Sequence, residues 1–170
     1  MEFIKRKPKI FILSGKARSG KTETSKIIEN YYKEKKCITI SFAYYLKDYI
    51  KRITGWNGDE NTKPRELLQH LGIELIKNNI DDKLLINRIL QDIEVFSYFY
   101  DIIIISDARL VDEIESIKNK YPGSISIRIN NKKDNNLTSI LFFISSIHNF
   151  CNNSLGLVVS LPSQPVILLT

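Results

Sequence analysis

The chain has 170 residues, 43% of them hydrophobic and 26% charged, and it carries a formal net charge of +6. This size suits one domain with a buried core, and the composition is that of an ordinary soluble protein, which excludes a disulfide-rich scaffold. Cys37 and Cys151 show no metal-site spacing and no C-x-x-C pair, so a reducing, cytoplasmic compartment is expected.

The positive charge favours a polyanionic ligand, such as a nucleotide, a nucleic acid or a membrane surface. No nucleic-acid-binding motif accompanies the charge, so small phosphorylated ligands are the simpler interpretation, and neither nucleic acid nor membrane is expected as a partner. The basic run Lys5–Lys9 is interpreted as a solvated lead-in. The N-terminal residues contain no apolar signal-peptide core, so no export signal is expected.

Residues 15–22 follow the pattern G-x-x-x-x-G-K-T, which predicts a phosphate-binding loop between a buried strand at Ile10–Ser14 and a helix within Thr22–Lys33. Backbone N–H groups of the loop and of the helix N-terminus would form an anion cradle. Lys21 would reach the β- and γ-phosphates of ATP, and the Thr22 hydroxyl would bind Mg²⁺. The expected ATP-binding residues are Gly15, Lys16, Ala17, Arg18, Ser19, Gly20, Lys21 and Thr22.

The next elements follow from apolar periodicity. Residues 37–42 predict a second strand, and apolar side chains at a 3.6-residue spacing predict a helix from Ala43 to near Gly55. After a polar loop over 56–63, Pro64 suits the first position of another helix. The apolar face of that helix is expected to comprise Leu67, Leu68, Leu71 and Leu75.

Further along the chain, Asp81 and Asp82 signal the start of another helix. Its inward residues are expected to be Leu84, Leu85, Ile89 and Ile93. The run Asp101–Asp107 contains four consecutive isoleucines and predicts a strand buried on both faces, as in a parallel sheet. A helix and a last strand over 124–129 follow, and the helix is marked by Val111, Ile114 and Ile117.

The alternation of strands and helices predicts a doubly wound α/β fold, in which ligands bind at the carboxyl ends of parallel strands. Both the 15–22 loop and Asp107 fall at such ends. Residues 1–134 are predicted to form this domain.

The tail from Asn135 to Thr170 is unusual because its 36 residues include no Asp, Glu, Lys or Arg. Polar residues interrupt its apolar run 140–144 well before the roughly 18 residues of a membrane span. Residues 135–170 are therefore treated as an atypical C-terminal tail. Four interpretations stay open, namely an altered or out-of-frame end, an extra apolar strand pair, a weak membrane-contacting segment and a disordered tail; the first is preferred.

The end of the isoleucine strand carries the second candidate constellation, Ser106–Arg109. Asp107 could hold Mg²⁺ directly or through water, and Arg109 could bind a phosphate with both arms of its guanidinium. The alternative is that Asp107 caps the next helix and Arg109 lies on the surface. The functional interpretation is preferred because both residues would lie beside the phosphate loop.

Two other segments offer candidate ligand contacts. Arg65, Gln69 and Gly72 share one stripe of their predicted helix and could line a nucleotide, although a solvated helix face explains the same composition. After the second strand, Phe42 could stack on a base and Lys47 could reach a phosphate. The alternatives are core packing for Phe42 and a surface position for Lys47.

Four blocks together resemble the deoxynucleoside monophosphate kinase family of bacteriophages and bacteria. The blocks are Gly15–Thr22, Phe42–Lys47, Arg65–Glu74 and Ser106–Arg109 with Glu113. Their order and spacing agree over about residues 8–130, and the Arg-x-x-Leu-Gln-x-Leu-Gly-x-Glu block is the most specific. The family is part of the phosphate-loop nucleoside monophosphate kinases and is related in pattern to dephospho-CoA kinase and phosphomevalonate kinase.

The resemblance implies a P-loop NTPase fold with three α/β/α layers, and transfer of the ATP γ-phosphoryl group to a deoxynucleoside monophosphate with Mg²⁺. Lys21, Asp107 and Arg109 would be the catalytic residues, and Thr22 and Asp107 would hold the metal. The acceptor nucleotide would be bound by Phe42, Ala43, Lys47, Arg65, Gln69 and Arg109.

Other functions remain open at this stage. The chain could phosphorylate another small acceptor of the dephospho-CoA or phosphomevalonate type. It could also bind nucleotide without turnover, because Lys83 and Arg88 are the only cationic residues between Asn78 and Tyr100, where the wider group has an arginine-rich lid. The preferred base is not determined, and a homodimer is neither required nor excluded.

Overall fold

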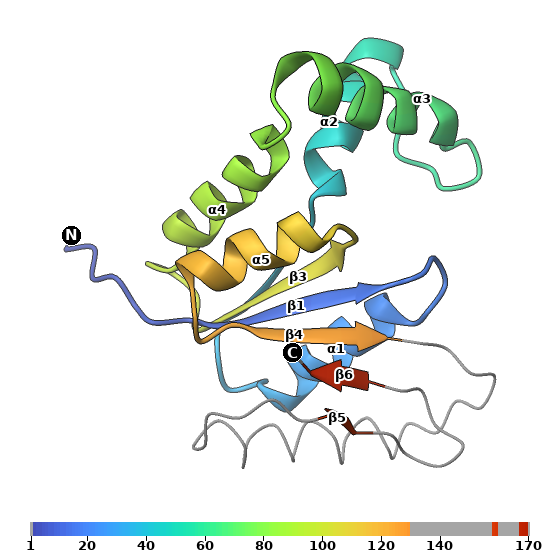
Figure 1. The fold of residues 1–170 in the computed structure, drawn as a ribbon. Helices are drawn as coiled ribbons and strands as arrows, with labels where there is room; N and C mark the ends of the chain where they lie inside the picture. Colours follow the sequence, from blue (N-terminus) through green and yellow to red (C-terminus); the bar gives the residue numbers. More distant parts are fainter. Residues whose placement is uncertain (1, 130–157, 160–166, 170) are drawn as a thin grey trace.

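The computed structural model describes residues 2–129, 158–159 and 167–169. A six-stranded sheet forms the centre of the molecule, in the order β2-β3-β1-β4-β6-β5 (Figure 1). Four of its strands are parallel, as the sequence predicted for this domain: β1 (Lys9–Gly15), β2 (Cys37–Ile40), β3 (Ile102–Ala108) and β4 (Ile125–Ile129).

Two short strands extend this sheet in the antiparallel direction. β6 (Ile167–Leu169) pairs with β4, and β5 (Val158–Val159) pairs with β6. These five residues match the strand-pair interpretation of the charge-free tail. The other tail residues from 135 onward lie outside the described part of the chain, and among the described helices none is long and apolar enough to cross a membrane.

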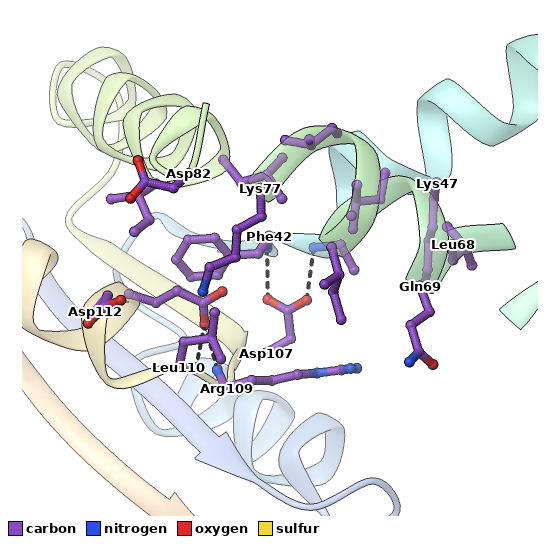
Figure 2. A pocket seen from close by; sticks show the side chains of 18 of the residues that line it. Phe42, Lys47, Leu68, Gln69, Lys77, Asp82, Asp107, Arg109, Leu110 and Asp112 are labelled. Atoms are coloured by element: carbon purple, nitrogen blue, oxygen red, sulfur yellow. Dashed lines mark hydrogen bonds between the residues drawn. The ribbon is translucent and has the colours of Figure 1, made fainter. Parts of the chain in front are cut away.

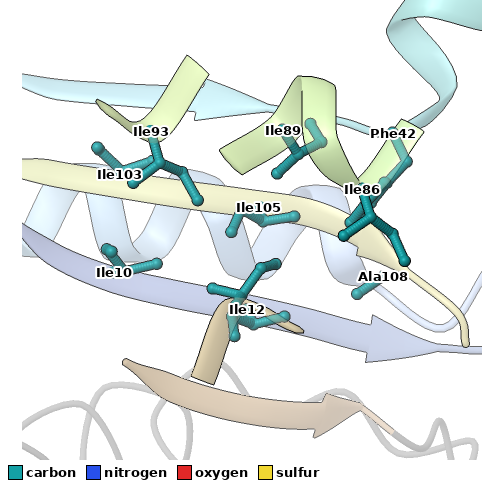
Figure 3. Close-up of a cluster of buried hydrophobic side chains, with 10 residues drawn as sticks. Ile10, Ile12, Phe42, Ile86, Ile89, Ile93, Ile103, Ile105 and Ala108 are labelled. Atoms are coloured by element: carbon teal, nitrogen blue, oxygen red, sulfur yellow. The ribbon is translucent and has the colours of Figure 1, made fainter. Parts of the chain in front are cut away.

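The sheet is buried on both faces, as four consecutive isoleucines require. On one face, Ile104 of β3 packs with Ile27 and Ile28 of α1 (Lys21–Tyr31). On the other face, Ile105 packs in a cluster with Ile89 and Ile93 (Figure 3). Because side chains alternate along a strand, a central parallel strand covered by helices on both faces needs an unbroken apolar run.

Besides α1, the described residues form four α-helices and one π-helical segment, which lie between the strands in the sequence. α4 (Leu84–Phe96) and α5 (Val111–Lys120) cover the face opposite α1, as Figure 1 shows. α2 (Ala43–Thr54), α3 (Arg65–Gln69) and η1 (His70–Ile80) form a helical unit beyond one end of the sheet. The observed fold is therefore α/β, with helices on both faces of the parallel strands.

Most predicted helix boundaries are confirmed within one or two residues. α2 ends where Gly55 takes a left-handed conformation (φ +73°) and its N–H bonds the Lys51 carbonyl at 2.9 Å. Pro64 caps α3 from the preceding position, so its predicted place inside the helix was wrong by one residue. The helix marked by Val111, Ile114 and Ile117 is present as α5, in which Val111 is exposed and Ile117 is fully buried.

The predicted apolar face of the helix after Pro64 is partly wrong. Leu67 and Leu75 are exposed by 41% and 49%, whereas Ile76 is buried. For Leu75 and Ile76 the cause is the winding of η1, whose π-type i→i+5 hydrogen bonds place about one more residue in each turn than an α-helix does. The pocket-lining residues accordingly recur as pairs four residues apart, namely Leu68 and Gln69, Gly72 and Ile73, and Ile76 and Lys77.

The connections after β1 and β3 leave the sheet on opposite faces. β1 leads to α1 on one face, and its neighbour β3 leads to α5 on the other. Such a reversal between adjacent parallel strands opens a crevice at their carboxyl ends, where α/β proteins bind their ligands. The 15–22 loop and the Asp107–Arg109 segment flank this crevice.

Candidate functional site

The 15–22 loop joins β1 to α1 and depends on two glycines. Gly15 has φ +145°, and a Cβ built on it would lie 2.4 Å from the carbonyl oxygen of Ile129. Gly20 has φ +95° and stands immediately before α1. Other residues rarely adopt these conformations, so the G-x-x-x-x-G spacing fixes the path of the loop.

Lys21, the first residue of α1, folds back over this loop. Its Nζ donates hydrogen bonds to the carbonyl oxygens of Gly15 at 2.8 Å and Lys16 at 2.6 Å. Burial lowers the pKa of Lys21, the positive charge of Arg109 lowers it further, and the carboxylate of Asp107 opposes both effects. The ammonium group therefore lies within electrostatic reach of the end of β3.

The start of α1 offers free hydrogen-bond donors. The first N–H groups of a helix have no partner inside it, and within the described residues no acceptor is found for the amides of Lys21 and Thr22. The side chain of Thr22 is exposed, as are Lys16, Ala17 and Arg18. Amides, an ammonium group and a hydroxyl at a helix N-terminus form an arrangement suited to an anion.

A pocket of about 700 Å³ lies between the helical unit and the end of β3 (Figure 2). Its walls come from four segments far apart in the sequence, namely the start of α2, the α3–η1 helix, the start of α4 and the β3–α5 connection. The charged residues that line it are Lys47, Lys63, Arg65, Lys77, Asp82, Asp107, Arg109, Asp112 and Glu113. The apolar residues that line it include Phe42, Leu46, Leu68, Ile73, Ile76, Leu85 and Ile86.

This pocket brings together the residues predicted to bind the acceptor. Its lining includes Phe42, Ala43, Lys47, Arg65, Gln69 and Arg109, together with Asp107. The residues predicted to bind ATP lie on the 15–22 loop and do not line it. The two regions are close at Lys21, whose pKa is shifted by the charges of Asp107 and Arg109.

Asp107 makes a contact that the sequence did not predict. Its Oδ1 accepts the N–H of Phe42 at 2.8 Å and its Oδ2 accepts the N–H of Ala43 at 3.0 Å, as the dashed lines in Figure 2 mark. Asp107 thus caps α2, not the next helix as the alternative interpretation held. The following helix, α5, is capped instead by Glu113, whose Oε2 accepts the N–H groups of Arg109 at 2.7 Å and Leu110 at 2.9 Å.

Five cationic side chains and four carboxylates line the pocket, so positive charge is in slight excess. Asp107 and Glu113 already accept two backbone N–H bonds each. Among the described residues, the side chains of Arg65, Lys77 and Arg109 have no carboxylate within ion-pair distance. The site therefore suits an anionic ligand.

Thr22 and Asp107 could hold Mg²⁺ only if waters and substrate phosphates supplied its remaining ligands. No group of three or more His, Cys, Asp or Glu side chains that could enclose a metal occurs in the described part of the chain. Mg²⁺ usually takes one or two protein ligands together with waters and substrate phosphates. The exposed Thr22 hydroxyl fits that pattern, as do the lone pairs that Asp107 retains beyond its two amide bonds.

The sequence reasoning missed two lysines of the pocket lining and one acidic residue that lies outside it. Lys63 was treated as part of a polar loop, and Lys77 was not given a binding role. Glu60, which pairs with Lys63, was not considered at all. Glu60 and Lys63 lie in the loop before α3, outside any helix, so no sequence pattern identified the pair.

No protein-family model matches this chain, and no curated protein matches it. The functional argument therefore depends on the motifs and on the geometry of the site.

Proposed function

We propose that this chain has a P-loop NTPase fold and transfers the γ-phosphoryl group of ATP to a nucleoside monophosphate, preferably a deoxynucleotide, giving the diphosphate. One observation carries the proposal. Residues assigned to the acceptor by motif resemblance come from three separate segments, around Phe42, Arg65 and Arg109, and all of them line a single pocket. A chance motif match gives no reason for that convergence.

In this proposal ATP binds at the 15–22 loop. The unpaired amides at the start of α1 bind phosphate oxygens, and Lys21 exchanges the carbonyls of Gly15 and Lys16 for the β- and γ-phosphates. Thr22 and Asp107 would hold Mg²⁺ together with the phosphates, and the bound ion would neutralise part of the phosphate charge.

The acceptor occupies the pocket beside that loop. A volume of about 700 Å³ is in the range of small-molecule sites, which combine apolar walls with a few polar groups. Leu68 offers apolar surface to a base, whereas Phe42 lines the same pocket but is only 5% exposed and packs in the buried cluster of Figure 3, as the core-packing alternative held. Lys47, Arg65 and Arg109 offer positive charge to the phosphate of the acceptor.

Phosphoryl transfer asks little covalent chemistry of the protein. Its demands are in-line placement of donor and acceptor and positive charge on the migrating oxygens. The attacking phosphate oxygen is already anionic, so no strong general base is required. Lys21 and Arg109 lie close enough for the charge of Arg109 to lower the pKa of Lys21, so both could act on the phosphates of donor and acceptor.

The test is an acceptor panel with γ-labelled ATP and Mg²⁺, comprising deoxynucleoside and ribonucleoside monophosphates, dephospho-CoA and phosphomevalonate. We expect a labelled diphosphate from at least one deoxynucleoside monophosphate. Label in dephospho-CoA or phosphomevalonate alone would move the assignment to another acceptor. If the chain binds ATP but forms no labelled product, it would be assigned as a nucleotide-binding protein without turnover.

A further inference from the structure

The loop between α2 and α3 carries an acidic residue to the rim of the pocket. Trp56 Nε1 donates to the carbonyl oxygen of Asp59 at 3.0 Å, and the Asp59 N–H bonds Asn57 Oδ1 at 2.9 Å. Asp59 Oδ1 in turn accepts the N–H of Asn61 at 3.0 Å. These bonds fix the turn that presents the next side chain, Glu60.

Glu60 binds two of the pocket's lysines. Its Oε1 and Oε2 lie 2.9 and 3.0 Å from Lys63 Nζ, and Oε1 lies 3.7 Å from Lys47 Nζ. The hydrogen bond from Lys63 lowers the pKa of Glu60, and the charges of Lys63, Lys47 and Arg65 lower it further. One carboxylate thus lies among three cations that line the pocket.

The exposed fractions of the three side chains show that Glu60 lies on the solvent side of Lys47 and Lys63. The side chains of Lys63 and Lys47 are 19% and 36% exposed, whereas that of Glu60 is 61% exposed. The lysines belong to the pocket lining and Glu60 does not. Glu60 therefore reaches sheltered cations from the solvent side and can leave without disturbing the pocket walls.

We propose that Glu60 is an internal competitor for the phosphate of the acceptor: it neutralises Lys47 and Lys63 in the empty pocket, and a bound phosphate displaces it. The identity of the incoming phosphate rests on the function proposed above. Glu60 then sets how tightly a phosphate is held, because only an anion gains enough from the two lysines to displace a carboxylate. An unphosphorylated nucleoside cannot do so.

The size of the effect follows from the exposure of the pair. Ion pairs in contact with solvent are weak, so a phosphate dianion can displace a single carboxylate. For the same reason, removing the competitor tightens phosphate binding by only about two- to fivefold. Selection for phosphorylated over unphosphorylated ligands rises by the same factor, because a nucleoside that leaves Glu60 in place gains nothing from its removal.

The test compares Glu60→Gln with Glu66→Gln, which removes an equal charge from the exposed first turn of α3 without touching a pocket lysine. Inorganic phosphate and each deoxynucleoside monophosphate are titrated by ³¹P NMR and calorimetry. Glu60→Gln is expected to bind both about two- to fivefold more tightly, and to lower the acceptor KM without lowering kcat. Glu66→Gln is expected to match the parent, and Lys63→Gln to bind phosphate more weakly.

The inference is overturned if Glu60→Gln binds phosphate as the parent does or more weakly while its thermal unfolding matches that of the parent. Glu60 would then position the lysines and would not compete with phosphate. Phosphate binding to neither the parent nor Glu60→Gln overturns it as well. The titration needs no turnover, so failure of the proposed kinase function can be distinguished from failure of the proposed role of Glu60. If no acceptor is phosphorylated but Glu60→Gln binds phosphate more tightly, the kinase assignment falls and the competitor role stands.

Discussion

The carboxylate of Asp107 accepts the backbone N–H of Phe42 at 2.8 Å, joining the end of β3 to the start of α2 across 65 residues of sequence. The neighbouring amide of Ala43 binds the second carboxylate oxygen. Both amides belong to residues that line the pocket. Asp107 therefore sets the position of the helix that carries Lys47, next to the loop proposed to bind ATP.

Replacing Asp107 by Asn should weaken this connection, because an amide group cannot accept both N–H bonds with its two terminal atoms. We expect a loss of about 1–3 kcal/mol in the free energy of unfolding, measured by urea denaturation. We also expect a higher acceptor KM. A Mg²⁺ titration of the rate separates the two roles of Asp107: an unchanged requirement indicates positioning alone, and a raised one indicates metal binding.

Lys21→Ala should abolish phosphoryl transfer, because the ammonium group proposed to bind the β- and γ-phosphates is lost. We expect the rate to fall at least about a hundredfold, with a circular dichroism spectrum like that of the parent. Lys26→Ala is the control, since Lys26 lies on the same helix and, within the described part of the chain, pairs only with the exposed Glu23. Activity of Lys21→Ala within a few-fold of the parent would contradict the assigned role.

Gly15→Ala should disturb the loop itself. The added Cβ would meet the Ile129 carbonyl oxygen at 2.4 Å in a conformation, φ +145°, that alanine rarely adopts. We expect strain of about 1–3 kcal/mol and a lower melting temperature together with weaker ATP binding. Gly123→Ala should be nearly neutral, because no described atom lies within 4 Å of its added Cβ. Equal melting temperatures for the two variants would refute this description of the loop.

Glu113 provides a pH-dependent test of the α5 cap. Burial raises the pKa of Glu113 above its ordinary 4.5, although the amides of Arg109 and Leu110 oppose the shift. Between 4.5 and the raised pKa, the folded chain holds a proton that the unfolded chain has released. Stability falls with rising pH wherever the folded state binds more protons, so Glu113 lowers stability through this window.

In Glu113→Gln a carbonyl oxygen can still accept both amides, but the group does not titrate. The free energy of unfolding of the variant should therefore rise relative to that of the parent as the pH increases from 4.5 through the raised pKa of Glu113. Urea denaturation at each pH measures the difference. A difference that stays flat or falls over this range would show that the carboxyl is not destabilised by burial.

Local patterns were sufficient to predict most of the fold. The isoleucine run of β3 indicated burial on both faces, and all its four isoleucines are buried. Gly55 indicated the end of α2, and the glycine spacing indicated the 15–22 loop. These signals depend on neighbours in the sequence, so periodicity and turn chemistry capture them.

The errors concern contacts between distant segments. The winding of η1 moved Leu75 outward and Ile76 inward, and no local pattern signals an i→i+5 helix. The bond from Asp107 to Phe42 depends on how β2 and β3 pair, which the sequence alone does not show. The residues proposed to bind the acceptor nevertheless line one pocket, because motif resemblance carries information about distant contacts that periodicity lacks.

The central claim is that the amides at the start of α1 and the ammonium group of Lys21 bind a nucleotide polyphosphate. Calorimetric titration of the folded chain with Mg-ATP tests it most directly, with Lys21→Ala as the comparison. The account predicts saturable heat and a raised melting temperature for the parent, and a large loss of both for the variant. No heat and no thermal protection in the parent would contradict it.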